Sequence, residues 1–290
     1  MKSKILFTAV FTAGFLLMTG CSKKTEYETT RVQTWASLET YVPEGVNYPP
    51  AEYSLPEKFY PWTGTVSHHQ LTDKLIDDWF YQIKIRRSVR NFFIITPSHY
   101  GLSTQDYSVA NCEWYCGKDG FVQTNTELAE EVCKQLGVTF DNEVFPVEHG
   151  ASCLMPYIKK YFPKAKVVVI AVNGEPPINM PYVQKLNEGL SGFFTKSSKK
   201  KDFLIISSDF SHHSPLEETL TKDSHTMIFM NEPTPVNFLA SVCDNRAGIY
   251  VMANNLTQPA KAHILYHTNS YYLSGMDELD ITSYYFTLFE

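Results

Sequence analysis

Three histidines follow short segments that have the character of buried β-strands. His68 comes after residues 64–67, His99 after the apolar run 92–96, and His212 after a turn that continues the apolar run 203–206. In an α/β protein the carboxyl ends of neighbouring strands open onto one crevice, where ligands bind. Neutral imidazole is a common ligand for transition metals and a general base near neutral pH. The repeated placement therefore predicts that these rings converge on one metal ion or one substrate.

Two carboxylates accompany these rings in the sequence. Asp209 lies three residues before His212, and Glu148 directly precedes His149. A carboxylate beside an imidazole can orient the ring or exchange a proton with it. Asp209 could instead cap the turn that follows it, and any single histidine could be a surface or packed residue. The repetition favours the chemical interpretation for His68, His99 and His212.

Composition and motif searches exclude several classes of function. The chain of 290 residues carries a formal charge of −6, which disfavours nucleic acid as a partner and leaves a small-molecule substrate or a metal ion as the expected ligand. It contains no P-loop, no Gly-x-Gly-x-x-Gly after a strand, no His-Glu-x-x-His and no Gly-x-Ser-x-Gly. The sequence identifies no protein partner.

The N-terminus resembles the signal peptide of a bacterial lipoprotein. Lys2 and Lys4 precede an apolar stretch over residues 5–18, and a small residue then precedes Cys21. We expect residues 1–20 to be removed, Cys21 to carry lipid, and the protein to be anchored to a membrane in the bacterial cell envelope, outside the cytoplasm. The alternative is an ordinary signal peptide with an incidental cysteine. Residues 21–57 are interpreted as a tether and N-terminal arm.

Five cysteines follow Cys21, and two of them lie four residues apart. Cys112 and Cys116 are interpreted as a local disulfide in preference to half of a zinc site, because no second pair of ligands lies nearby. Cys133 is expected to be a buried helix residue.

Alternating helices and strands predict one α/β domain over residues 58–290. Helical patterns cover 71–85, 126–136, 155–161, 181–194, 217–229, 236–242 and 247–255, and strand patterns cover 92–96, 166–172, 203–207, 262–267 and 283–289. Asn125 or Thr124 is expected to cap the second helix and Gly137 to end it. This order is typical of a three-layer fold with a mainly parallel or mixed central sheet covered by helices.

Several segments resemble the motifs of Memo-like proteins. Residues 96–99 resemble the family's Gly-Pro-Ser-His, residues 207–212 its Ser-Ser-Asp-Phe-x-His, and residues 148–150 its Glu-His-Ser. Residues 243–249 resemble its Cys-Gly-Arg-x-Pro-Ile, and residues 282–284 its Val-Ser-Tyr. The bacterial members of this family are the B component of the AmmeMemoRadiSam system. Their fold is similar to that of the class III extradiol dioxygenases, which are non-haem iron enzymes that cleave catechol rings.

The resemblance implies roles for particular residues. His68, His99 and Cys243 would be the metal ligands, and Asp209, His212 and His149 would act in the same pocket as acid, base or orienting groups. One transition metal is implied, with iron(II) or copper favoured and zinc possible. His69 is an alternative to His68, and Cys243 could instead be an inert thiol or the disulfide partner of Cys133 or Cys153.

Two classes of function follow from this resemblance. The first is a membrane-anchored, metal-dependent oxidoreductase of the extradiol dioxygenase type. The second is a non-catalytic lipoprotein that uses the same pocket to bind a metal or another ligand.

Overall fold

The computed structural model describes residues 27–34, 45–173 and 179–290. The expected signal peptide and Cys21 lie outside the described residues. Among the residues that are described, no helix has the length and apolar character needed to cross a membrane.

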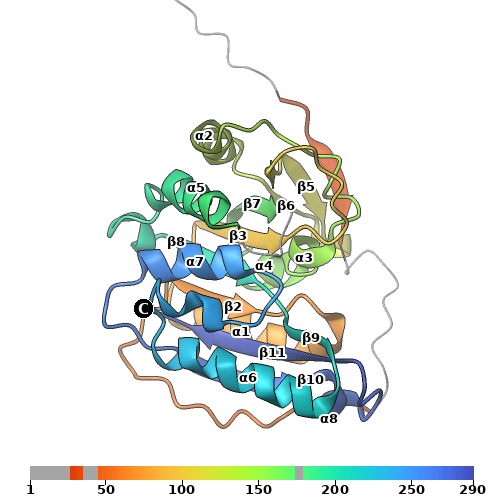
Figure 1. Cartoon of the computed structure of the whole chain (residues 1–290). Helices are drawn as coiled ribbons and strands as arrows, with labels where there is room; N and C mark the ends of the chain where they lie inside the picture. The colour runs from red at the N-terminus through yellow and green to blue at the C-terminus, as the bar shows by residue number, and fades with distance from the viewer. Residues whose placement is uncertain (1–26, 35–44, 174–178) are drawn as a thin grey trace, which may run out of the picture.

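A mixed five-stranded sheet forms the centre of the molecule (Figure 1). Its strands, in spatial order, are β2 (Thr63–Val66), β8 (Asp202–Ser207), β3 (Asn91–Pro97), β7 (Lys166–Val172) and β4 (Tyr107–Val109). The first four run parallel and β4 pairs antiparallel with β7. Every residue of β3 and β8 is buried, which is the pattern expected of strands covered on both faces.

Two hydrophobic clusters cover the two faces of this sheet and make the fold three-layered. Side chains of α1 (Asp73–Lys84) and α4 (Met155–Tyr161) pack with Phe92, Ile94 and their neighbours on one face. Side chains of α2 (Thr126–Leu136), α5 (Met180–Ser191) and α7 (Arg246–Asn255) pack on the other face, with α6 (Leu216–Asn231) contributing Phe229 and Met230. The structure thus confirms the predicted α/β fold class.

A second, antiparallel sheet adjoins the edge strand β2. Its order is β10 (His263–Asn269), β11 (Ile281–Leu288) and β9 (Phe210–Ser214). Trp62 N donates to Phe289 O at 2.9 Å, and Phe289 N donates to Thr63 O at 2.8 Å. Gly64 is required at this seam, because a Cβ there would lie 2.1 Å from Thr287 O.

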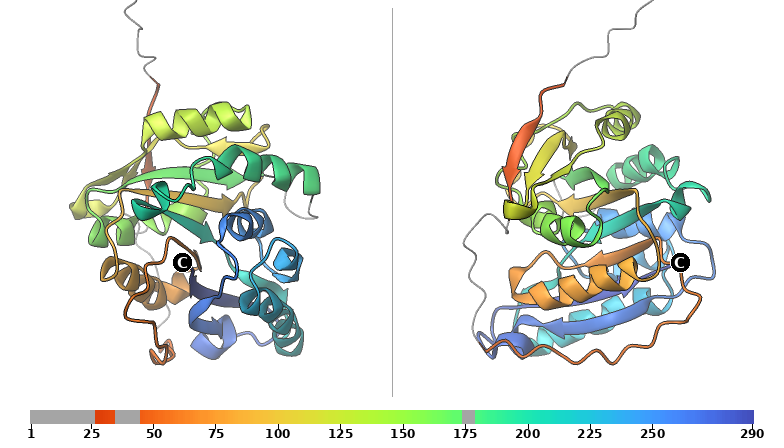
Figure 2. Two further views of the ribbon diagram at one scale, coloured as in Figure 1. Left: turned by 90° about the vertical axis from the view of Figure 1, so that its left-hand side faces the viewer. Right: turned by 180° about the vertical axis from the view of Figure 1, so that it is seen from behind.

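The described parts of the N-terminal arm pack against the domain. In the third sheet β1 (Thr30–Gln33) runs parallel to β5 (Cys112–Tyr115), which also pairs with β6 (Phe121–Gln123). Further along, the Tyr48 and Tyr53 hydroxyls donate to carboxylates of α1. Figure 2 shows this arm running along the outside of the domain. The described parts of the N-terminal arm expected within residues 21–57 therefore lie against the domain.

The predicted elements agree with the structure most closely where the caps are strong. Helix α2 begins with the Asn125 side chain accepting from Leu128 N and ends at Gly137, whose φ of 70° is left-handed. The helix predicted at 236–242 is only a short 3₁₀ helix, Asn237–Ala240. The remaining short helices are α3 (His149–Ser152), α8 (Ser270–Ser274), Gln70–Thr72, Gly117–Asp119 and Ser198–Lys200.

The expected disulfide between Cys112 and Cys116 is absent, and both residues are buried free thiols. Cys112 begins β5, and this extended strand runs up to the residue before Cys116. An extended chain separates the two Cα atoms by roughly 10 Å or more, beyond the limit of roughly 7 Å for a disulfide.

Candidate metal centre

The site lies at the carboxyl ends of three neighbouring strands of the central sheet. His68 follows β2 by two residues, Asp209 follows β8 by two residues, and His99 follows β3 by two residues. Since β2, β8 and β3 are adjacent and parallel, all three side chains reach the same edge. The prediction that strand ends gather these residues is confirmed for His68 and His99.

Three imidazoles form the three-histidine cluster of His68, His99 and His149. Each offers one ring nitrogen, and these nitrogens all lie within 4.8 Å of one another, so the cluster could hold a metal ion. The rings of His99 and His149 stack with centroids 4.2 Å apart. His69 is not part of this cluster, and its Nδ1 makes a hydrogen bond with the Tyr284 hydroxyl. Of the two adjacent histidines, His68 is therefore the one that belongs to the cluster.

The rings of His68 and His99 are each held through their Nδ1 atom. His68 Nδ1 lies 3.1 Å from Ser207 Oγ, and His99 Nδ1 lies 2.7 Å from Glu148 Oε1. Glu148, only 1% exposed, also accepts from the backbone N–H of His99 and from that of Gly150. Metal-binding histidines commonly have their second nitrogen fixed in this way. The Nε2 atoms are left to face the site.

Asp244 completes the inner wall of the site. Its Oδ2 lies 3.3 Å from His68 Nε2, 3.4 Å from His212 Nε2 and 3.8 Å from His99 Nε2. Its Oδ1 is held separately, by the Ser208 hydroxyl at 2.8 Å and the backbone N–H of Asp209 at 3.1 Å. Oδ2 is buried, and its partners are these three imidazole nitrogens. A buried carboxylate oxygen surrounded by imidazole nitrogens fits a bound cation.

Burial and these carboxylates pull the imidazole pKa values apart. Burial lowers the pKa of His149 to about 4, with further lowering from His68 and His99. Burial also opposes the charge on His99, but Asp244 and Glu148 outweigh it and raise the pKa of His99 to about 10. The pKa of His212 is raised as well, because Asp244 outweighs the effect of burial. The metal-free site thus combines a neutral ring, His149, with a protonated one, His99, at neutral pH.

Asp209 and His212 both border the site but do not pair with each other. Among the described contacts, Asp209 Oδ2 faces His68 Nε2 at 3.7 Å, whereas His212 faces Asp244. His212 lies on β9 between Ser211 and His213, which have positive φ values of 45° and 52°. Non-glycine residues rarely adopt this conformation, and such strain is concentrated at functional sites. The expected Asp209–His212 pair is therefore replaced by a His212–Asp244 pair.

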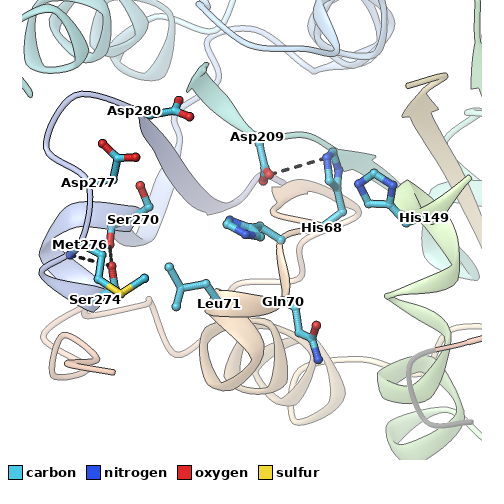
Figure 3. Close-up of a pocket in the computed structure, with 11 residues that line it drawn as sticks. His68, Gln70, Leu71, His149, Asp209, Ser270, Ser274, Met276, Asp277 and Asp280 are labelled. Carbon is cyan, nitrogen blue, oxygen red and sulfur yellow. Dashed lines mark hydrogen bonds and ion pairs between the residues drawn. The ribbon is translucent and has the colours of Figure 1, made fainter. Parts of the chain in front are cut away.

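A cavity of about 430 Å³ opens beside the cluster (Figure 3). His68, His149 and Asp209 lie at its inner end, and Met276, Asp277 and Asp280 lie at its outer end. A substrate could therefore reach the cluster from solvent.

The model of the family described as "Memo-like protein" matches residues 70–282. The chain belongs to the Memo-like family. Among its relatives, a MEMO1 family protein of Sulfurisphaera tokodaii is 24% identical over 174 residues, which cover 59% of this chain and 57% of that protein. A MEMO1 family protein of Sulfolobus acidocaldarius is 25% identical over 206 residues, 66% of each chain. The match therefore spans somewhat more than half the length of these curated relatives.

A solved structure shows the same fold. The crystal structure of the uncharacterized protein JW3007 from Escherichia coli K12 is similar with a TM-score of 0.51 and 11% sequence identity, over 77% of this chain and 98% of that one. At this identity the likeness concerns the architecture, which is the mixed α/β arrangement described above.

Asp244 occupies the cysteine position of one family motif when the motif is aligned from its C-terminal residues. In the Memo-like motif Cys-Gly-Arg-x-Pro-Ile, the cysteine precedes the arginine by two residues and the isoleucine by five. Counting back from Arg246 and Ile249 places Asp244, not Cys243, at the cysteine position. Cys243 is not part of the three-histidine cluster, and its backbone forms a bridge with Phe210. Its role as a ligand stays a prediction.

Proposed function

We propose that this Memo-like protein is a non-haem, metal-dependent oxidoreductase of the extradiol dioxygenase type. His68, His99 and Asp244 would hold the metal, and Asp244 would take the place that the sequence suggested for Cys243. The observation that carries the proposal is the buried Asp244 Oδ2, which lies within 3.3–3.8 Å of three Nε2 atoms. Two histidines and one carboxylate are the ligand set typical of non-haem iron(II) oxygenases. Iron(II) is therefore favoured, with copper and zinc as alternatives.

Bound iron(II) would supply redox chemistry toward dioxygen and would bind an oxygen atom of the substrate. The other groups around the cavity would handle protons. His149, neutral because of its low pKa, can accept one at its ring nitrogen, whereas the raised pKa of His212 suits it to donate one. Asp209 Oδ1, which has no hydrogen-bond partner within the described residues, can accept an O–H or N–H of the substrate.

The roles of His212 and Asp209 are tested by variants measured with three readouts. His212→Ala should retain the metal and lose oxygen uptake with catechols, and Asp209→Asn should retain reduced uptake with a shifted pH profile. Metal content and melting temperature are measured on the same preparations. If both variants only lower the melting temperature and keep full turnover per folded molecule, the two residues are structural.

A non-catalytic role in holding a metal is the second candidate. The observation in its favour is the three-histidine cluster itself, since three imidazoles also suit zinc. Elemental analysis of protein purified without oxygen, followed by oxygen-uptake assays with catechols, separates the two. Zinc as the resident metal, with no uptake after iron(II) loading, would favour the second candidate.

The proposed location is the bacterial cell envelope, with lipid on Cys21. The apolar leader that precedes Cys21 supports this location. Five residues lie between Cys21 and Tyr27, whose hydroxyl donates to Glu130 Oε1 on α2 at 2.7 Å. A chain of that length spans at most about 20 Å, so α2 would lie close to the membrane. Cys21→Ala should release the protein from membranes or leave it unprocessed, with Ser22→Ala as the matched control; unchanged anchoring of Cys21→Ala would refute the proposal.

A further inference from the structure

The cavity beside the cluster has chemically different ends. Its inner end is formed by His68, His149 and Asp209 (Figure 3). Its outer end is formed by the turn that leads into β11, which contributes Met276, Asp277 and Asp280. A ligand that fills it therefore contacts the candidate metal centre at one end and a solvent-exposed turn at the other.

Acidic side chains dominate the charge of this cavity. Its lining includes Asp209, Asp277 and Asp280 and contains no lysine or arginine. Asp209 has a potentially cationic partner in His68, whose Nε2 lies 3.7 Å away, and Asp280 has one in His213, whose Nδ1 lies 2.7 Å away. Asp277 Oδ1 accepts from the backbone N–H of Leu279 at 3.3 Å, which is a neutral partner. The outer end of the cavity thus carries two carboxylates, Asp277 and Asp280, and no lysine or arginine lines the cavity beside them.

Asp209 provides a separate polar group that a ligand of this cavity could contact. Its carboxylate is only 4% exposed, lines the cavity, and has a buried Oδ1 with no hydrogen-bond partner in the described part of the chain. A buried carboxylate oxygen without a donor is costly. A ligand that carries O–H or N–H donors into the cavity would satisfy it.

Two apolar side chains line the cavity, Leu71 from the segment that follows His68 and Met276 from the turn at the outer end (Figure 3). The other lining residues between the ends are polar: His69, Gln70, Ser270 and Ser274. Apolar walls with a few placed polar groups are typical of sites for small molecules, and a cavity of about 430 Å³ lies within their usual size range. The body of the ligand is therefore expected to be apolar or aromatic.

We propose that this cavity selects a small organic cation, with an oxygen donor directed at the candidate metal centre and a protonated amine directed at Asp277 and Asp280. The direction of the oxygen end rests on the proposed function; the preference for a cation rests on the charge of the cavity. Anionic compounds of the same size are excluded by the same carboxylates.

The test compares ligands that differ only in charge. Zinc-loaded protein is titrated calorimetrically with three catechols that carry an aminoethyl, an ethyl or a carboxyethyl group. We expect the amine to bind roughly 3- to 10-fold more tightly than the neutral compound, and the acid to bind most weakly. The difference should narrow at high salt, because exposed charges are screened.

Two double variants show whether the outer carboxylates cause the preference. Asp277→Asn/Asp280→Asn should abolish most of the difference between amine and neutral compound. Glu127→Gln/Glu131→Gln removes the same total charge on α2, far along the chain from the cavity turn, and should leave the difference unchanged. Equal binding of all three compounds, no binding of any, or an unchanged preference in the first variant would overturn the proposal.

A separate titration distinguishes this proposal from that of the metal centre. Phenethylamine and phenylpropionate lack the diol, and they are titrated into metal-free protein. If the protein prefers the amine but fails to bind metal when metal is added, the cationic cavity is supported and the metal centre is refuted. If the protein binds metal but shows no preference for the amine, the metal centre is supported and the cationic cavity is refuted.

Discussion

Asp244→Asn tests the most specific feature of the site, the carboxylate that faces three imidazoles. Asparagine keeps an oxygen in the position of Oδ1, so the hydrogen bonds from Ser208 and from the backbone of Asp209 can persist. The charge near the Nε2 atoms of His68 and His99 is lost. The variant therefore removes a ligand while preserving the local fold.

The size of the effect can be estimated from Coulomb's law. A dication about 4 Å from a carboxylate gains about 8 kcal/mol at an effective dielectric constant of 20. Much of this gain is offset, because the ion must lose its water shell and displace protons from the imidazoles that face Asp244 in the metal-free protein. We expect a net loss of about 2–4 kcal/mol, which corresponds to a zinc affinity roughly 30- to 1,000-fold weaker.

The assay is competition for zinc against a chromophoric chelator, with Cys243→Ser as the matched control at the adjacent position. Cys243→Ser should change the affinity by less than about threefold. The reasoning is refuted if Cys243→Ser loses the metal and Asp244→Asn retains it, because the sequence-based assignment of Cys243 would then be correct.

The remaining predictions concern the supports of the site, its protons and the seam between the sheets. Glu148→Gln should weaken metal binding about 10- to 100-fold without unfolding the protein, because it removes the charge that orients His99; zinc competition and thermal melting measure this. Zinc affinity should rise with pH by up to about tenfold per pH unit below pH 10. The reason is that the metal must displace a proton from His99, which Glu148 and Asp244 hold protonated in the metal-free protein. Calorimetric titration in buffers of different ionisation enthalpy counts the released protons, and an affinity that does not change with pH would contradict the prediction. Gly64→Ala should lower the free energy of unfolding by about 2–3 kcal/mol in urea melts, because its Cβ would collide with Thr287 O; an unchanged midpoint would show that the seam can open at no cost.

The sequence predicted the fold well where hydrophobic runs and caps were strong. The parallel strands β3, β7 and β8 are continuous apolar runs, and α2 has a capping asparagine and a terminal glycine. Short strands such as β5 and β9 were missed, because their few residues carry no clear periodicity and tertiary pairing decides their conformation. The missed β5 also explains the wrong disulfide, since an extended segment holds Cys112 and Cys116 apart.

The candidate site was predictable in its position and less so in its contacts. Parallel strands bring His68 and His99 to one edge, and a parallel sheet follows from the alternation of strands and helices. The contacts of Asp244 and Glu148 depend on loops packed from distant parts of the chain, which no local pattern encodes. A count of the family motif from Arg246 would have identified Asp244.

The central claim is that His68, His99 and Asp244 form one metal site. Anomalous X-ray diffraction from crystals of protein purified without oxygen tests it most directly, with elemental analysis of the same preparation. One metal peak per chain in contact with the Nε2 atoms of His68 and His99 and with Asp244 Oδ2 is predicted. A metal coordinated elsewhere, or crystals soaked in iron(II), copper and zinc that show no peak at this cluster, would contradict it.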